Sequence, residues 1–158
     1  MTAAVLIIGG GGREHALAVA MMRSPLVADV FMTAGSAGCE AFAMPEMIDG
    51  GDYHSLAAFC QKRDIALVII GPEVPLAEGA ADVLRAEGLA VFGPSQKAAR
   101  IEYSKIYAKT LMRANGIPTL PFAVCEDAAQ VAKWCAARRP PFVIKADSLA
   151  AGKGVFVC

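Results

Sequence analysis

Residues 5–18 read Val-Leu-Ile-Ile-Gly-Gly-Gly-Gly-Arg-Glu-His-Ala-Leu-Ala, and this stretch decides the fold. Four apolar residues run into four glycines, and an amphipathic segment then extends from Glu14 to Ser24 until Pro25 stops it. This order is typical of a strand, a tight turn and a helix. Residues 66–70 form a second apolar run, unbroken and rich in β-branched side chains, as expected for a central parallel strand buried on both faces.

Short apolar runs and amphipathic segments alternate along the chain. Further strands are predicted at residues 30–32, 43–44 with 47–48, and 90–92, and helices at 53–63, 76–87, 96–102 and 104–115. A second set then begins, with strands predicted at 122–124, 142–145 and 155–157 and a helix at 127–138. Alternation at this spacing predicts an α/β fold with a doubly wound parallel sheet. We expect one complete domain at 1–116 and the incomplete beginning of another at 117–158.

Charge and composition exclude several classes of protein. The 158 residues include 15 basic and 15 acidic ones, and this balance argues against nucleic-acid binding, which needs clustered Lys and Arg. The apolar runs are too short to span a membrane, and no signal-peptide pattern is present. Five scattered cysteines without a C-x-x-C pair indicate reduced, buried thiols in a cytoplasmic protein, and two histidines argue against a zinc site. We therefore expect neither a nucleic acid nor a membrane as a partner.

The glycine cluster is the first candidate site. Glycines between a strand and a helix let backbone N–H groups approach an anion, and a bound phosphate would explain Arg13, since the helix dipole disfavours a cation there. An exposed arginine in a tight turn is the alternative. The dinucleotide fingerprint G-x-G-x-x-G fails because its third glycine falls on Glu14 or His15, and no carboxylate follows the second strand at residues 33–34 to bind an adenosine ribose. The loop therefore disfavours NAD.

Two further loops follow predicted strands. Gly71-Pro72-Glu73-Val74-Pro75 holds a carboxylate between two prolines, at the strand ends where open α/β sheets bind ligands. Glu73 is suited to accept hydrogen bonds from sugar hydroxyls; alternatively, it stabilises the start of the next helix. Gly93-Pro94-Ser95 has a comparable position, but a turn followed by a helix cap also explains it.

A third candidate site is the segment Lys145-Ala146-Asp147-Ser148-Leu149-Ala150-Ala151-Gly152-Lys153-Gly154. A lysine that closes a strand, followed by a loop with a second lysine between glycines, suits a polyphosphate. The P-loop pattern is not met, since Asp147 stands where a glycine is needed and Gly154 where Ser or Thr is needed. The loop returns into a strand, which indicates either a hairpin lid over nucleotide phosphates or a solvated hairpin with incidental lysines.

Together these motifs resemble one enzyme family. They are Gly-Gly-Arg-Glu-His-Ala at 11–16, Gly-Pro-Glu-Val-Pro-Leu at 71–76, Phe-Gly-Pro-Ser at 92–95, Ser-Lys at 104–105 and Lys-Ala-Asp-Ser-Leu-Ala-Ala-Gly-Lys-Gly at 145–154. In this order and spacing they resemble the phosphoribosylamine–glycine ligase family, purine-biosynthesis enzymes of the ATP-grasp superfamily. The resemblance covers the whole chain. It implies a Rossmann-like pre-ATP-grasp domain followed by the truncated start of an ATP-grasp domain.

The resemblance also implies a reaction and a set of site residues. In the family, ATP with magnesium phosphorylates the carboxylate of glycine, and the amine of 5-phosphoribosylamine attacks the acyl phosphate to give glycinamide ribonucleotide, ADP and phosphate. The residues expected to bind the phosphoribosyl substrate are Gly11, Gly12, Arg13, Glu14 and Glu73, and those expected at the ATP phosphates and in the lid are Lys105, Lys145, Gly152, Lys153 and Gly154. No catalytic residue or metal ligand is assigned. The full-length enzyme is expected to be a cytoplasmic monomer.

The sequence departs from the family pattern at two places. Ser148 stands where a glycine is expected in the lid motif, and Tyr103 where a small residue is expected before Ser104. The magnesium ligands are expected beyond Cys158, so the chain alone is expected to be inactive. Two alternatives stay open: a non-catalytic sugar-phosphate-binding or interaction module with the same scaffold, and a fragment of a nicotinamide-dependent oxidoreductase. The failed dinucleotide fingerprint weighs against the second.

Overall fold

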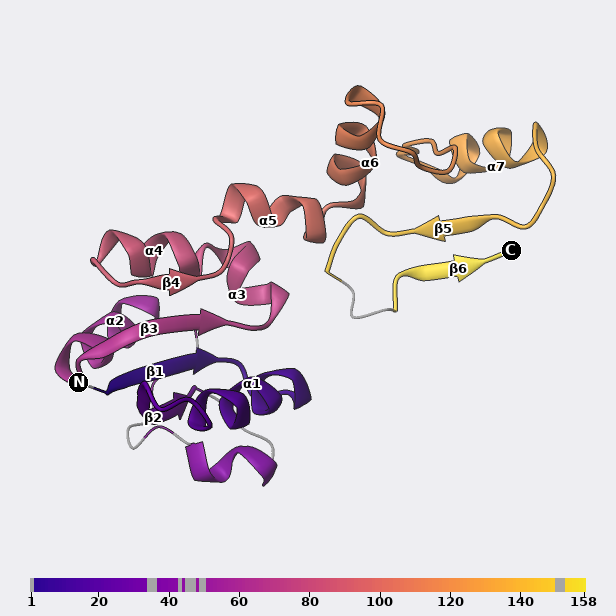
Figure 1. Cartoon of the computed structure of the whole chain (residues 1–158). Coiled ribbons are helices and arrows are strands. Elements are labelled where there is room, and N and C mark those ends of the chain that lie inside the picture. Colours follow the sequence, from indigo (N-terminus) through magenta and orange to yellow (C-terminus); the bar gives the residue numbers. More distant parts are fainter. Residues whose placement is uncertain (1, 34–36, 43, 45–47, 49–50, 150–152) are drawn as a thin grey trace. The chain divides into compact units, whose positions relative to one another are not determined.

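The computed structural model describes residues 2–33, 37–42, 44, 48, 51–149 and 153–158. It divides into two compact units, Met1–Ala99 and Arg100–Cys158, which Figure 1 shows and which are described separately below. Helix α5 (Gln96–Tyr103) contains the point of division. No helix within the described ranges is long and apolar enough to cross a lipid bilayer. The domain boundary expected between residues 116 and 117 stays a prediction.

The first unit is built on a parallel sheet of four strands in the order β2-β1-β3-β4. These are β1 (Ala3–Ile8), β2 (Val27–Met32), β3 (Ile65–Ile70) and β4 (Val91–Phe92). β1 pairs on both sides, because Leu6 lies opposite Phe31 of β2 and opposite Val68 of β3. The two apolar runs that decide the fold in the sequence, 5–8 and 66–70, are therefore the central pair of strands.

Helices cover both faces of this sheet (Figure 1). One face carries α1 (Gly12–Met22) and the 3-10 helix η1 (Ala37–Phe42), and the other carries α2 (Tyr53–Lys62) and α4 (Ala80–Ala86). β1 contributes to both layers, since Ile7 packs in the first and Ile8 in the second. A strand that is covered on both faces needs apolar residues at every position. This arrangement confirms the doubly wound α/β fold.

Two predicted elements of the first unit differ in the structure. The helix predicted at 76–87 is in fact two helices, α3 (Glu73–Glu78) and α4. Gly79 separates them because it adopts a left-handed conformation with φ +92°, which ends α3. Of the strand predicted at 43–44 with 47–48, residues 44 and 48 belong to no strand, and residues 43 and 47 lie outside the described residues.

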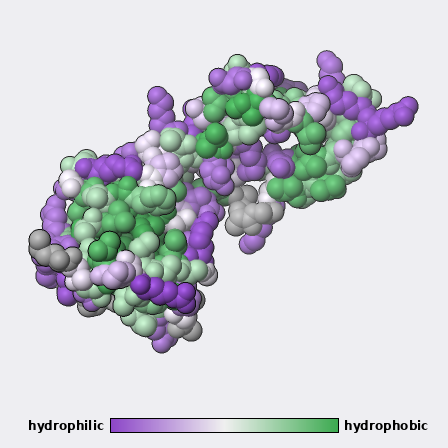
Figure 2. Space-filling model, viewed as in Figure 1, coloured by the Kyte–Doolittle hydropathy of each residue, from purple (hydrophilic) through white to green (hydrophobic). Residues whose placement is uncertain are grey.

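The second unit contains α6 (Lys105–Ala114), α7 (Ala128–Ala136) and the antiparallel pair β5 (Val143–Lys145) and β6 (Val155–Val157). The strand predicted at 122–124 is wrong. A strand needs a ladder of backbone hydrogen bonds to a neighbour, and no described segment pairs with these residues. Several large apolar side chains of this unit are exposed, including Phe156 and Val157, and Figure 2 shows apolar surface on it.

The cysteines, too, are buried in the first unit and more exposed in the second. Cys39 and Cys60 are buried in the two layers of the first unit, as predicted. In the second unit, Cys125 and Cys135 are half-buried and Cys158 is exposed, so the prediction of buried thiols does not hold in this unit and is plainly wrong for Cys158. The reason is that Cys158 directly follows β6, whose residues are all exposed.

Candidate functional site

The candidate site of the first unit lies where two loops leave neighbouring strands. Gly9–Gly12 follows β1, and Gly71–Glu73 follows β3. In the strand order β2-β1-β3-β4 the chain goes from β1 to one side of the sheet and later returns to the other side, so the β1/β3 pair is a topological switch point. Open α/β sheets bind their ligands at the carboxyl ends of the strands at such a point. The backbone ties the second loop to the end of β1, since the N–H of Gly71 donates to the carbonyl of Ile8 over 3.2 Å.

Glu14 is the buried charge at this point. Only 4% of the residue is exposed. Its Oε2 accepts a hydrogen bond of 2.8 Å from the N–H of Gly11, and its Oε1 accepts one of 2.9 Å from Nε of Arg13. Burial alone raises the pKa of the Glu14 carboxyl, but the hydrogen bonds from Arg13 and Gly11 outweigh this effect and hold the pKa below its usual range. Glu14 therefore points into the protein as a carboxylate.

Three glycines of these loops make room for that side chain and for Pro72. A Cβ atom at Gly71 would lie 2.6 Å from Cγ of Glu14, and one at Gly11 would lie 2.8 Å from its Oε2. At Gly9, whose φ is +115°, a Cβ would lie 2.7 Å from Cγ of Pro72. Gly12 differs, because nothing lies within 4 Å of its Cβ position. Gly9 and Gly11 of the glycine cluster thus serve internal packing, and at Gly12 the backbone is open.

Arg13 lies between the carboxylates of the two loops. Its Nε donates to Glu14, and its Nη2 is 3.8 Å from Oε2 of Glu73, the first residue of α3. The side chains of Arg13 and Glu73 are 64% and 47% exposed, so both reach solvent. All five residues predicted for the phosphoribosyl substrate are therefore close together, and all of them except the buried Glu14 are exposed. A guanidinium beside a carboxylate acceptor suits a ligand that carries both a phosphate and hydroxyl groups.

Sequence reasoning missed Thr33, which follows β2. Its Oγ1 accepts a hydrogen bond of 3.0 Å from the N–H of Gly9 and so fixes the start of the glycine loop. Its place at the end of the second strand is where dinucleotide-binding proteins carry the acidic residue for the ribose. His15 packs away from the loop, with its ring 6.1 Å from that of Phe42 in η1. These contacts hold the loop from the side of β2 and η1.

In the second unit, Asp147 joins the loop after β5 to the start of α6. Ser104 caps α6, since its hydroxyl accepts from the N–H of Tyr107. The same hydroxyl donates to Oδ2 of Asp147 over 3.0 Å, and the N–H of Ile106 donates to Oδ1 over 3.0 Å. Desolvation raises the pKa of Asp147, but the N–H of Ile106, Ser104 and the charge of Lys105 together lower it below its usual range. Sequence reasoning assigned Asp147 no role of its own: it noted the residue as a departure from the P-loop and as part of the motif at 145–154.

The lysines predicted at the ATP phosphates all lie in this unit. Nζ of Lys105 donates to the carbonyl of Ser148 over 2.9 Å, so this lysine is held against the loop after β5. Lys145 ends β5 opposite Val155 and is exposed, as is Lys153. The N–H of Ala146 donates to the carbonyl of Gly154 and closes the base of the loop. Gly152 lies outside the described residues.

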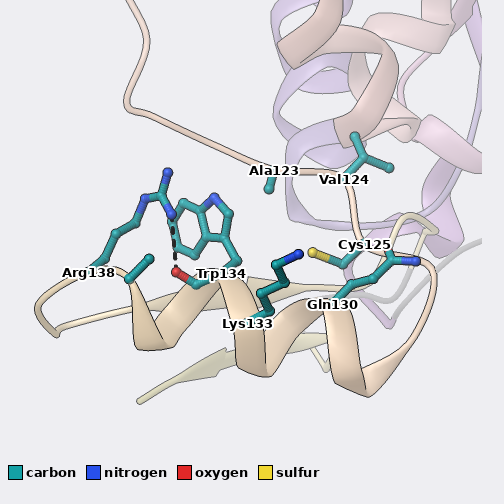
Figure 3. A pocket seen from close by; sticks show the side chains of 8 residues that line it. Ala123, Val124, Cys125, Gln130, Lys133, Trp134 and Arg138 are labelled. Atoms are coloured by element: carbon teal, nitrogen blue, oxygen red, sulfur yellow. Dashed lines mark hydrogen bonds between the residues drawn. The ribbon is translucent and has the colours of Figure 1, made fainter.

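An open groove of about 340 Å³ lies beside α7 and contains none of the predicted site residues. Figure 3 shows Trp134 and Arg138 along it, with a hydrogen bond of 3.1 Å from Arg138 to the carbonyl of Trp134. The guanidinium of Arg138 also lies 4.1 Å from the centre of the Trp134 ring.

Within the described ranges, no group of three or more His, Cys, Asp or Glu side chains is arranged to hold a metal ion.

Comparisons with known proteins identify relatives for both units. The model of the phosphoribosylglycinamide synthetase N domain matches residues 3–102, and that of the ATP-grasp (A) domain of the same enzyme matches residues 103–158. Phosphoribosylamine–glycine ligase from Neisseria meningitidis is 45% identical over 153 residues, and that from Nostoc is 44% identical over 155 residues. Each match covers 97% of this chain and 36% of the relative, so the chain spans about a third of the length of these ligases.

Solved structures give the same result. The crystal structure of phosphoribosylamine–glycine ligase from Thermotoga maritima is similar with a TM-score of 0.73 and 33% identity, over 98% of this chain and 35% of that one. N5-carboxyaminoimidazole ribonucleotide synthetase from Thermus thermophilus has a TM-score of 0.66 at 23% identity, over 97% of this chain and 40% of that one. The second likeness concerns the fold alone.

Proposed function

This chain belongs to the phosphoribosylglycinamide synthetase family, and on that premise we propose that it is the N-terminal part of a ligase that joins 5-phosphoribosylamine to glycine with ATP. The carboxylate of glycine attacks the γ-phosphorus of ATP, which forms an acyl phosphate and releases ADP. The amine of 5-phosphoribosylamine then attacks the acyl phosphate, which releases phosphate and a proton and forms the amide of glycinamide ribonucleotide. Catalysis of this kind depends on positioning the reactants and neutralising charge.

The arrangement of Arg13 and Glu73 at the β1/β3 switch point carries this proposal. Arg13 and the open backbone at Gly12 bind the phosphate of the phosphoribosyl group, where the N-terminus of α1 adds favourable dipoles. Glu73 accepts hydrogen bonds from the ribose hydroxyls or from the amine. Glu14 lies buried behind the same loop, and its carboxylate accepts the N–H of the exposed Gly11. Thr33 stands where a dinucleotide site needs an acid, which disfavours the nicotinamide alternative.

The second unit contributes to ATP binding in this proposal. Lys105, Lys145 and Lys153 neutralise the phosphates, and Gly154, which has no side chain, allows the loop to approach them. Gly152 is assigned to the same loop on the family resemblance alone. Magnesium, when bound, would supply positive charge that offsets the negative charge developing on the transferred phosphoryl group. Its ligands belong to parts of the ligase outside this chain. A cytoplasmic location and a monomeric full-length enzyme complete the proposal; like the magnesium site, they rest on the family resemblance.

Calorimetry on the 158-residue chain tests this function. Ribose 5-phosphate, ATP and NAD are titrated separately into the parent chain and into Arg13→Ala. We expect ribose 5-phosphate to bind and Arg13→Ala to weaken it by at least about tenfold, because a hydrogen bond to a charged group is lost. Glu87→Gln is the control, since Glu87 caps the end of α4 and pairs with His54 at 3.1 Å. Preferential binding of NAD, or no binding of any of the three ligands, would contradict the proposal.

A further inference from the structure

We propose that Glu14 is a positioning residue, which holds Arg13 and joins the loop after β1 to the loop after β3 without contacting the substrate. The inference rests on the proposed function and assigns a role within the same site. It differs from the expectation that Glu14 itself belongs to the substrate-binding set. Its basis is the packing around the side chain: Glu14 touches both loops, and each of its carboxylate oxygens has a donor of its own.

The two oxygens of Glu14 have different partners. Oε2 accepts a hydrogen bond from the N–H of Gly11, which is one of the backbone donors that an α-helix leaves unpaired at its N-terminus. Oε1 accepts a hydrogen bond from the Nε–H of Arg13. A buried carboxylate is costly unless it is paired and hydrogen-bonded, and this one is both. Because the N–H of Gly11 is occupied, an anion at this helix end meets the open backbone at Gly12 instead.

The hydrogen bond at Nε fixes the orientation of the Arg13 guanidinium group. A guanidinium is planar and carries donors on Nε and on both Nη atoms. Because Nε is bonded to Glu14, a phosphate must be bound through the Nη atoms, and the plane of the group is set before the ligand arrives. Nη2 also lies 3.8 Å from Glu73, so the orientation of Arg13 relates the phosphate contact to the carboxylate proposed for the ribose. Preorganisation of this kind improves affinity by reducing the entropy lost on binding.

The glycines explain why a glutamate of this length is needed. Gly71 and Gly11 bring their backbones so close to Glu14 that a Cβ on either would overlap with it, although Gly71 comes from the other loop. The carboxylate therefore lies between the loops and fixes their separation. An aspartate is shorter by one methylene group and does not reach both Gly11 and Arg13 from the same helix position. Glu14→Asp should thus resemble Glu14→Gln in binding rather than the parent.

A double-mutant cycle tests whether Glu14 acts through Arg13. The dissociation constant for ribose 5-phosphate is measured for the parent chain, Arg13→Ala, Glu14→Gln and the double variant, with Glu87→Gln as the matched Glu-to-Gln control. We expect Arg13→Ala to weaken binding by at least about tenfold and Glu14→Gln by several-fold. In the Arg13→Ala background, Glu14→Gln should have no further effect, since the residue it positions is gone.

Additive losses would overturn the inference, because they would mean that Glu14 contacts the ligand or supports the fold independently of Arg13. Unchanged binding in Glu14→Gln would also overturn it. A parent chain that binds no sugar phosphate contradicts the proposed function itself, and this outcome is visible before any variant is made. The two failures are therefore distinguishable.

A measurement on the parent chain covers the case in which Glu14→Gln does not fold. Nuclear magnetic resonance of ¹⁵N-labelled protein reports the Nε–H of Arg13 directly. We expect a separate signal, protected from exchange with water at pH 7, because the proton is bonded to a buried carboxylate. A rapidly exchanging signal, like that of a solvent-exposed arginine, would contradict the positioning role.

Discussion

The carboxylate of Asp147 accepts a hydrogen bond of 3.0 Å from the hydroxyl of Ser104, a residue 43 positions earlier in the chain. Ser104 is the N-cap of α6, and Asp147 also receives the N–H of Ile106 in the first turn of that helix. A carboxylate at a helix N-terminus is favoured by the unpaired N–H groups and the helix dipole. One side chain thereby fixes the loop that follows β5 to the beginning of α6.

Asp147→Ala is therefore expected to release this loop as well as destabilise α6. We expect a loss of about 1 kcal/mol or less in the free energy of unfolding, since Asp147 is exposed to solvent, together with weaker ATP binding, because Lys105 is held against the same loop. Asp127→Ala is the matched control: Asp127 caps α7 through the N–H of Gln130 at 2.8 Å. It should lower stability similarly but leave ATP affinity unchanged. Equal effects on ATP affinity would refute a specific role for Asp147.

Gly71→Ala should destabilise the chain and Gly12→Ala should not. A methyl group at Gly71 would collide with the buried Glu14 side chain, and overpacking of this kind costs about 1–3 kcal/mol. The same change at Gly12 meets open space at the start of α1 and should leave stability unchanged or raise it by up to about 1 kcal/mol. Urea unfolding of the two variants checks this. A Gly71→Ala chain as stable as the parent would mean that Glu14 is not packed against the second loop.

The low pKa of Glu14 predicts a dependence of stability on acid pH. The folded pKa lies below the ordinary value of about 4.3, so the stabilisation is complete above that value and is lost as the pH falls through the folded pKa. The free energy of unfolding of the parent should therefore fall more steeply than that of Glu14→Gln between about pH 5 and pH 3. Above pH 6 the two curves should run parallel. If the free energies of unfolding of the two proteins depended identically on pH below pH 5, the interactions of the Glu14 carboxylate would contribute no net stability.

The thiols should differ in reactivity according to their burial. Burial raises the pKa of the Cys60 thiol to about 11, and the thiolate is the reactive form. Cys158 is exposed. A thiol reagent at pH 8 should modify Cys158 first and Cys60 only when the first unit unfolds. Peptide mass spectrometry over time separates the two sites, and modification of Cys60 in the folded chain would contradict its place in the core between α2 and the sheet.

Features set by local patterns could be predicted from the sequence. β1, α1 and β3 follow from apolar runs, glycines and a proline that are neighbours in the chain, and the doubly wound sheet follows from their alternation. The strand at 122–124 could not be judged in this way, because a strand exists only with a partner, and none of the described segments provides one. Gly79 likewise reads as an ordinary small residue until its left-handed conformation is seen.

For the candidate site, too, the sequence predicts the features set by local motifs but not those that depend on residues distant in the chain. The motifs identify which loops matter, and Arg13 and Glu73 do lie on adjacent loops. The sequence does not distinguish the exposed Arg13 from the buried Glu14 beside it, since the burial of Glu14 is set by Gly71 in the other loop. The contacts of Thr33 and Asp147 were missed for the same reason, because their partners, Gly9 and Ser104, are distant in the chain.

The ligase assignment is tested most directly by restoring the rest of the enzyme. This chain is joined to the residues of the Neisseria meningitidis ligase that follow its matched segment, and formation of glycinamide ribonucleotide and ADP is measured. We expect both products, in equal amounts and only when glycine and 5-phosphoribosylamine are both present, with kcat/KM reduced at least about tenfold in Arg13→Ala. A folded hybrid that forms no glycinamide ribonucleotide, while the intact Neisseria enzyme does so under the same conditions, would contradict the assignment.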